Sequence, residues 1–187
     1  TKSTTDLWHH DVLSRQHPNI MSILQAAQVP FGADTMWSSM TAAYDRLPYA
    51  LKLLFENIEI EHDSLYLMLR HDFGDPTIIE KIVANREHAV HPAVVRHHAT
   101  GKPCLVVGDA YVQRIKGYAT IHSEALLTLA NEREPGDVAI WDNFATSHYG
   151  VSADIGSSLR RLHRVASWSE RVRPQPYLVQ PLAEAAE

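Results

Sequence analysis

The chain contains a single cysteine, Cys104, among its 187 residues. One cysteine excludes an internal disulfide and a cysteine-based zinc cluster, and it fits a reducing compartment such as the cytoplasm. No apolar run approaches the ~20 residues that a membrane-spanning helix needs. The start of the chain also has no signal-peptide core. We therefore expect a cytoplasmic protein that does not enter a membrane.

A strong excess of charge of one sign is also lacking. The chain has 17 Lys and Arg against 22 Asp and Glu, a formal net charge of −5, and no basic block. This balance argues against a nucleic-acid-binding protein. Apolar residues make up 45% and charged residues 21%, which excludes a disordered or low-complexity chain. The length predicts one domain over residues 1–187.

Short strands and frequent turns dominate the sequence pattern. Helices are expected at 39–47, 49–58 and 123–131, with Ser123 as the N-cap of the last and Pro48 at the start of the second. A turn is expected at 30–34, no clear structure at 64–86, and a coil or arm from 173 onward. Strands are expected at 7–12, 20–29, 90–97, 103–107, 110–115, 136–141 and 159–168. This pattern is typical of a mainly β domain with flanking helices, either a sandwich or a jelly roll.

Histidine, in contrast, is abundant, with 12 residues. It is the commonest neutral metal ligand in proteins. In a strand, residues i and i+2 lie on the same face, so His9 and Asp11 could hold one ion. His148, in the loop expected after the strand at 136–141, is the best candidate for a third ligand. Two histidines and one carboxylate on one side of an octahedron suit non-haem Fe(II) and oxygen chemistry.

Simpler interpretations exist for each of these residues. A lone H-x-D triplet is frequent by chance, and His148 alone is more often a surface or core histidine. We interpret the remaining histidines as non-ligands, including the His97–His98 pair, which has no carboxylate beside it in the sequence. A zinc hydrolase with the same three ligands is a weaker alternative.

Two arginines share one face of the strand expected at 159–168, because Arg160 and Arg164 are an even number of residues apart. Such a pair indicates a bound anion, and arginine is suited to bidentate carboxylate binding. It is equally typical of a solvent-exposed edge strand that resists aggregation. The residues alone leave both interpretations open.

Four motifs occur in one order along the chain: WHHD at 8–11, GADTMW at 32–37, PGDVAIWDNFATSHYG at 135–150 and RRLHR at 160–164. Together they resemble the taurine dioxygenase family of Fe(II)- and 2-oxoglutarate-dependent dioxygenases. The resemblance implies a double-stranded β-helix, also called a jelly roll or cupin-like fold. It further implies an oxidoreductase that uses O2 to hydroxylate a small anionic organic substrate, with release of succinate and CO2. Sulfonates, alkyl sulfates and aryloxyalkanoates are the substrate types expected.

The resemblance also assigns roles to individual residues. The Fe(II) ligands, which are also the catalytic residues, fall on His9, Asp11 and His148. The 2-oxoglutarate-binding residues fall on Thr35, Arg160 and Arg164. Positions that line the substrate pocket fall on Val12 and Tyr111. A homo-oligomer, either a dimer or a tetramer, is implied as well.

Some features depart from the family pattern. Family members are usually longer, so we expect the chain to lack, or not to show, an N-terminal section, and the segments near 63–64 and 132–135 look short. Phe144 stands where many relatives have arginine. Two alternatives remain: a biosynthetic hydroxylase or desaturase acting on an amino-acid-like substrate, and a non-catalytic cupin-like binding protein. The intact carboxylate of Asp11 argues against a halogenase.

Overall fold

The computed structural model describes residues 7–28, 35–69, 76–108, 110–130, 140–150, 161–167 and 172–177. The strands are β1 (Met21–Gln28), β2 (Thr35–Ser39), β3 (Glu59–Asp63), β4 (His88–Pro92), β5 (Val94–Arg96), β6 (Pro103–Leu105), β7 (Val112–Ile115), β8 (Ile140–Asp142), β9 (Thr146–Gly150) and β10 (Arg161–Ser167). The helices are α1 (Met40–Arg46), α2 (Tyr49–Glu56), α3 (Ser64–Leu69), α4 (Pro76–Ala84) and α5 (Thr120–Ala130). None of these helices is long and apolar enough to cross a membrane.

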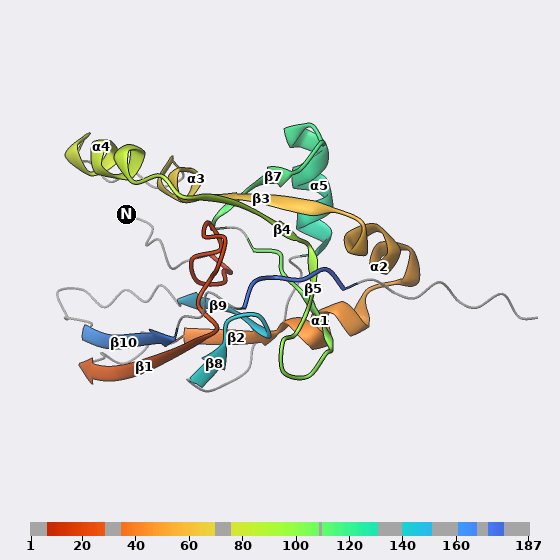
Figure 1. Ribbon diagram of the computed structural model, residues 1–187, viewed down its shortest axis with the longest axis horizontal. Helices are drawn as coiled ribbons and strands as arrows, with labels where there is room; N and C mark the ends of the chain where they lie inside the picture. The colour runs from red at the N-terminus through yellow and green to blue at the C-terminus, as the bar shows by residue number, and fades with distance from the viewer. Residues whose placement is uncertain are drawn as a thin grey trace, which may run out of the picture.

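The strands form two layers (Figure 1). One layer holds the sheet β10–β1–β8 and the pair β2–β9, and the other holds the sheet β4–β3–β7. All of these pairings are antiparallel. Helices α3, α4 and α5 lie beside the second layer, and the segment that precedes β1 runs between the two layers (Figure 1). The domain is therefore mainly β with flanking helices, as the sequence pattern predicts.

The strand pair β5–β6 connects two apolar clusters. Neighbouring residues of a strand point to opposite faces, and here Val94 packs in one cluster while Val95 packs in the other. Leu105 and Cys104 divide in the same way on β6. The first cluster also contains Phe55, Ile60 and Ile115, and the second contains Leu13, Met40, Val106 and Phe144. The β5–β6 pair thus fixes the spacing of the layers between which the candidate site lies.

Several predicted elements are confirmed. Strands β1 and β10 and helices α1 and α2 lie where the pattern places them, and α2 follows Pro48 directly. The strand expected at 90–97 is divided into β4 and β5, and the segment 64–86 contains the two helices α3 and α4. The turn expected at 30–34 and most of the strand expected at 136–141 lie outside the described residues.

Two local predictions are wrong. Residues 7–12 form no strand: His9 makes a single β-bridge, and the chain then turns at 11–14. Ser123 is not an N-cap, because α5 already begins at Thr120. Its buried hydroxyl instead donates to the carbonyl of Ala119 and accepts from the backbone N–H of Ile115, both at 3.1 Å. Ser123 therefore ties α5 to strand β7.

Three strands were not expected, namely β2, β3 and β9. The prediction that His148 lies in a loop is wrong, since it lies in β9. The coil or arm expected from 173 onward is coil over the residues described, with a single β-bridge from Pro176 to Val95. The Arg96 N–H donates to the Gln175 carbonyl at 2.9 Å, and the Tyr177 N–H donates to the Val94 carbonyl at 3.0 Å. These bonds dock the segment 172–177 onto the edge of β5.

Candidate metal centre

His9 and His148 are joined through their backbones. The His9 N–H donates to the His148 carbonyl at 2.9 Å, and the His148 N–H donates back at 2.8 Å. The two imidazole rings have centroids 4.1 Å apart. On the other side of β9, strand β2 pairs in a register that sets Trp37 opposite His148. Two residues 139 positions apart are thus held together by reciprocal backbone hydrogen bonds rather than by side chains alone.

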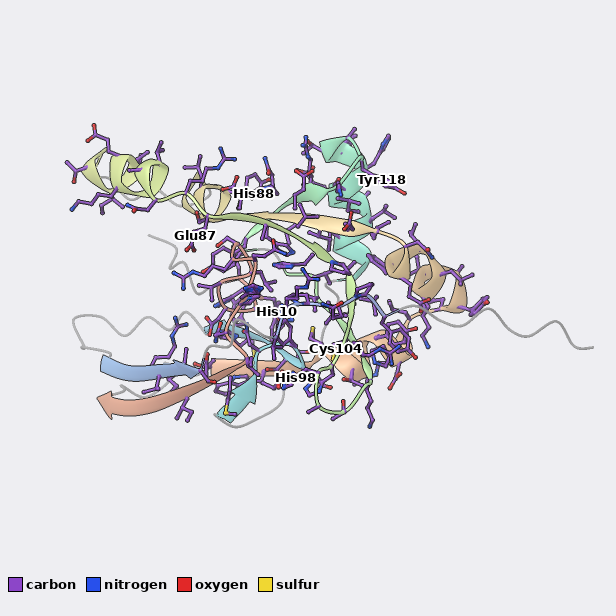
Figure 2. All side chains as sticks on the ribbon, viewed as in Figure 1. His10, Glu87, His88, His98, Cys104 and Tyr118 are labelled. Carbon is purple, nitrogen blue, oxygen red and sulfur yellow. The ribbon has the colours of Figure 1, made fainter. Side chains whose placement is uncertain are left out.

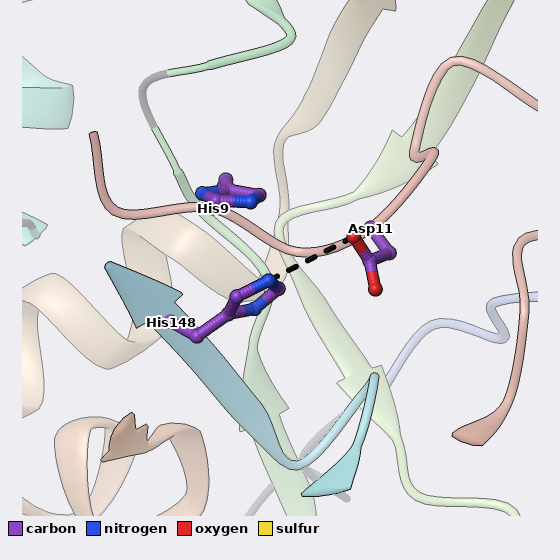
Figure 3. A group of neighbouring side chains, drawn as sticks. All are labelled: His9, Asp11 and His148. Carbon is purple, nitrogen blue, oxygen red and sulfur yellow. Dashed lines mark ion pairs between the residues drawn. The ribbon is translucent and has the colours of Figure 1, made fainter. Parts of the chain in front are cut away.

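Asp11 completes a group of three possible metal ligands. One ligand atom each from His9, Asp11 and His148 lies within 4.8 Å of the others (Figure 3). Asp11 Oδ1 is 3.7 Å from His148 Nε2, and all three residues are buried. Asp11 is the first residue of the turn at 11–14, so it lies beside the histidines without belonging to a strand. The structure therefore brings together the three residues that the motifs single out.

The hydrogen bonds of His9 leave one of its ring nitrogens available. Its Nδ1 lies 2.7 Å from the Leu7 carbonyl oxygen. A carbonyl only accepts, so in the neutral ring Nδ1 carries the hydrogen and Nε2 keeps a lone pair. A metal-binding histidine is commonly held in this way by a carbonyl that accepts from its other nitrogen.

The pKa values of the three groups also suit a cation. Burial lowers the pKa of His9, and burial together with the neighbouring His9 lowers the pKa of His148 to about 3. Burial alone would raise the pKa of Asp11, but His148, Arg164 and the Ser22 hydroxyl lower it by more. At neutral pH the group therefore presents two neutral imidazoles and one carboxylate. These are the protonation states that metal binding requires, and the donor set fits Fe(II).

Arg164 lies at the edge of this centre. It is on β10, opposite Leu24 of β1, and its Nη1 donates to Asp11 Oδ1 at 2.6 Å. The Arg164 side chain is 46% exposed, whereas the Asp11 side chain is 5% exposed. The guanidinium thus lies between the buried carboxylate and solvent, where an anionic ligand could reach it.

The structure describes three of the four other residues of the predicted site. Thr35 is on β2 opposite Gly150, on the strand pair that carries His148. Arg160 lies outside the described residues. Val12 has a φ of 47°, which is strained for a β-branched residue and costs on the order of 1–3 kcal/mol. The Tyr111 side chain is hydrogen-bonded to the backbone of Val12, and burial raises its pKa. Tyr111 thus packs against the turn that presents Asp11.

A second group of possible ligands contains His97, His98 and Asp142. The expectation that no carboxylate lies beside the two histidines is wrong, because the fold brings Asp142 to 3.2 Å from His97 Nε2. However, His97 Nδ1 accepts from the backbone N–H groups of Ala99 and Thr100. Nε2 must then carry the hydrogen and donate to Asp142, which leaves no lone pair for a metal. We interpret the His97–Asp142 contact as a structural link between the residue after β5 and the end of β8.

The polar residues that contact Asp11 carry little signal in the sequence. Ser22 donates to Asp11 Oδ2 at 2.8 Å, and the Asn143 side chain bonds to the Asp11 backbone. The only sequence signal for Asn143 is its place inside the long block that ends near His148. Ser22 carries no signal, because a buried serine on a strand looks like any other serine.

The chain is similar in sequence to a known family of dioxygenases. The model of the taurine catabolism dioxygenase TauD, TfdA family matches residues 1–166. An alkylsulfatase of Acinetobacter baylyi is 30% identical over 181 residues, which cover 84% of this chain and 55% of the relative. An alpha-ketoglutarate-dependent sulfate ester dioxygenase of Pseudomonas putida is 34% identical over 177 residues, covering 84% of this chain and 58% of the relative. The chain therefore spans a little over half the length of these two relatives.

A solved structure shows the same fold. The crystal structure of AAD-2 in complex with Mn(II) and N-oxalylglycine superposes with a TM-score of 0.77 at 25% identity, covering 92% of this chain and 72% of that one. The fold is a jelly roll, as predicted, and the match of the family model extends from before His9 to beyond Arg164. On these grounds the chain belongs to the taurine catabolism dioxygenase TauD, TfdA family.

Proposed function

We propose that the protein is an Fe(II)- and 2-oxoglutarate-dependent dioxygenase that hydroxylates a small anionic organic substrate. The reaction consumes one O2 and one 2-oxoglutarate for each substrate molecule and releases succinate and CO2. The observation that supports it most is the meeting of His9, Asp11 and His148 within 4.8 Å, with Arg164 against the same carboxylate. Family membership supports the same chemistry.

In this proposal, His9 Nε2, His148 and one oxygen of Asp11 hold the iron. Bound iron supplies the oxidising chemistry by activating O2 together with 2-oxoglutarate. The protein holds the two imidazoles neutral by burial and keeps Asp11 ionised, so that the ligand atoms carry no competing protons.

The cosubstrate is held by its distal carboxylate. Arg164 provides a guanidinium that is half exposed and therefore accessible, and Thr35 provides a hydroxyl on the neighbouring strand pair. Arg160 precedes β10 by one residue and is proposed to assist. An arginine fork matches a carboxylate in two parallel hydrogen bonds, which gives orientation as well as charge.

The substrate side is formed by Val12 and Tyr111, next to the turn that presents Asp11. Two relatives are named for sulfate ester or alkyl sulfate chemistry, so a sulfate ester is the first substrate class to test. Hydroxylation of the carbon that bears the ester oxygen gives an unstable product, whose C–O bond to sulfate breaks as the carbon becomes a carbonyl. Sulfate is released. Sulfonates and aryloxyalkanoates carry comparable anionic groups.

The first prediction tests the metal ligands. With Fe(II), 2-oxoglutarate and O2, we expect succinate release with at least one member of a panel of alkyl sulfates, sulfonates, aryloxyalkanoates and amino acids. His148→Ala should lower this release by more than ~100-fold, because changes to outer-shell partners alone cost ~10–100-fold. His122→Ala, at an exposed histidine of α5, is the matched control and should keep wild-type turnover.

Turnover of His148→Ala near the wild-type rate would refute the ligand assignment. Binding of 2-oxoglutarate without succinate release from any substrate would instead favour a non-catalytic binding protein.

We also propose that the protein acts in the cytoplasm as a dimer or tetramer and binds neither nucleic acid nor membrane. The single cysteine supports the cytoplasmic location, and the negative net charge without a basic block supports the lack of nucleic-acid binding. The dimer or tetramer is proposed from the resemblance to the family alone.

A further inference from the structure

Three buried polar side chains surround Asp11 and have no part in the function proposed so far. Asn19, Ser22 and Asn143 are each 0% exposed. Buried polar groups are costly unless they are hydrogen-bonded, so a buried cluster of three calls for an account of its bonds.

The three side chains form a closed ring of hydrogen bonds that begins and ends at Asp11. Asn143 Oδ1 accepts from the Asp11 N–H at 2.7 Å, and Asn143 Nδ2 donates to the Asp11 carbonyl at 2.9 Å and to Asn19 Oδ1 at 3.2 Å. Asn19 Nδ2 donates to Ser22 Oγ at 2.7 Å. Ser22 Oγ donates to Asp11 Oδ2 at 2.8 Å.

The ring has only one consistent direction. The backbone of Asp11 can only donate at its nitrogen and only accept at its carbonyl oxygen, which sets both atoms of the Asn143 amide. Asn143 Nδ2 then requires the oxygen of Asn19, so the nitrogen of Asn19 must face Ser22. With its oxygen accepting from Asn19, the Ser22 hydroxyl directs its hydrogen to Asp11 Oδ2. Ser22 therefore holds Oδ2 of the carboxylate, while Oδ1 accepts from Arg164 Nη1 at 2.6 Å and lies 3.7 Å from His148 Nε2.

The ring also joins the segments that carry the proposed ligands. Asn143 directly follows β8 and precedes β9, the strand of His148. Its backbone N–H donates to the Ile20 carbonyl at 2.7 Å, next to the start of β1. A substitution in the ring should therefore alter the position of the Asp11 carboxylate directly, because the ring contacts Asp11 itself.

We propose that Ser22, Asn19 and Asn143 are positioning residues that hold the Asp11 carboxylate in the orientation needed to bind a divalent metal. This inference rests on the function proposed above. Without the Ser22 hydroxyl, Oδ2 loses this donor and Arg164 holds the carboxylate through Oδ1 alone. The carboxylate then turns more easily about its Cβ–Cγ bond, and metal binding must stop that motion. Outer-shell partners of this kind contribute about 10–100-fold to metal affinity.

The test is a Mn²⁺ titration of the full chain, in which free Mn²⁺ is measured by electron paramagnetic resonance. Ser22→Ala should raise the Kd for Mn²⁺ by ~10–100-fold. Ser123→Ala is the matched control, because Ser123 is equally buried and hydrogen-bonded but ties α5 to β7. It should lower thermal stability and leave the Kd for Mn²⁺ unchanged. Ser22→Thr keeps the hydroxyl and should restore most of the affinity.

Each outcome separates this inference from the function beneath it. If the wild-type chain binds no Mn²⁺, the proposed metal centre is wrong. If the wild type binds and folded Ser22→Ala binds equally well, the positioning role is wrong. Should Ser22→Ala not fold, Ser22→Cys serves in its place, since a thiol keeps the size but donates only weakly. An unchanged Kd for Ser22→Cys would overturn the proposal in the same way.

Discussion

The guanidinium of Arg164 lies against the Asp11 carboxylate, with 2.6 Å between Nη1 and Oδ1. In the proposed reaction the same guanidinium also receives the distal carboxylate of 2-oxoglutarate. Asp11 therefore helps to hold Arg164 in place before the cosubstrate arrives. Arg164 is thus placed to contact both the metal ligand Asp11 and the cosubstrate of the proposed reaction.

Arg164→Gln should raise the KM for 2-oxoglutarate by roughly 30-fold, about 2 kcal/mol, with a smaller change in kcat. Removing one partner of a charge pair costs about 2–5 kcal/mol, and the half-exposed side chain places this pair at the low end. Steady-state succinate release at varied 2-oxoglutarate measures both constants. Arg114→Gln is the control, since Arg114 pairs with Glu61 at the surface. Equal KM values for Arg164→Gln and the wild type would remove Arg164 from cosubstrate binding.

Among the elements, helix α1 shows how a strand passes directly into a helix. Ser39 ends β2 and is the N-cap of α1, where its hydroxyl accepts from the Ala42 N–H at 3.2 Å. The first turn of α1 contains no acidic residue, so this cap is the side-chain group there that compensates the helix N-terminus. At the β2–α1 junction the Ser39 hydroxyl therefore adds to the backbone bond from the Met40 N–H to the Ala145 carbonyl, and β2 in turn pairs with the strand of His148.

Ser39→Ala should lower the free energy of unfolding by about 1 kcal/mol, since an N-cap is lost. Ser39→Asp keeps the acceptor and adds a negative charge at the helix N-terminus, so it should match or exceed the wild type. Urea unfolding measures both, and the midpoint should shift without a change in the m value. A Ser39→Ala midpoint equal to that of Ser39→Asp would show that the cap contributes little.

For the whole molecule, buried histidines make stability depend on pH. His62 is completely buried, and neither of its ring nitrogens has a hydrogen-bond partner among the described residues. Burial holds its pKa well below the ordinary 6.5, and the nearby His91 lowers it further. The pKa of His91 is also lowered by burial, although its Nε2 bonds to the Leu13 and Arg15 carbonyls. His10 is a further buried histidine in the interior (Figure 2).

The sign of this pH dependence follows from the two states. Above pH 6.5, His62 and His91 are neutral in both states and contribute no pH dependence. Below pH 6.5 the unfolded chain takes up more protons at these positions than the folded chain does, because both pKa values are lowered in the folded state, so stability falls as the pH falls. Each histidine contributes up to about 1.4 kcal/mol per pH unit. Urea unfolding at pH 7.5, 6.5 and 5.5 should show the loss below 6.5.

His62→Leu should flatten this decline, because one titrating group of the unfolded chain is removed. His122→Leu, at an exposed position of α5, should keep the wild-type slope. A wild-type slope in His62→Leu would contradict the assignment.

The elements that the sequence predicts well are those with a strong local signal. Pro48 marks the start of α2, and the apolar course after Ile20 marks β1. Strand β3 carries little such signal, because Glu59–Asp63 contains four ionisable residues in five. It is a strand because β4 and β7 pair with it on both sides and bury His62 and Asp63. The prediction of Ser123 as an N-cap failed for a related reason. Its hydroxyl accepts from the Ile115 N–H of β7, a contact that its local sequence does not show.

The motifs were enough to predict the family, the mainly β fold and the importance of His9, Asp11, His148 and Arg164. How these side chains meet can be seen only in the folded chain. Asp11 lies beside the histidines at the start of a turn, next to the strained residue Val12, and not in a strand. The ring of Asn19, Ser22 and Asn143 was equally hidden, because residue types and spacing do not show which polar groups become buried together. Asn143 joins this ring from 132 residues away from Asp11, and a contact across that distance forms only when the chain folds.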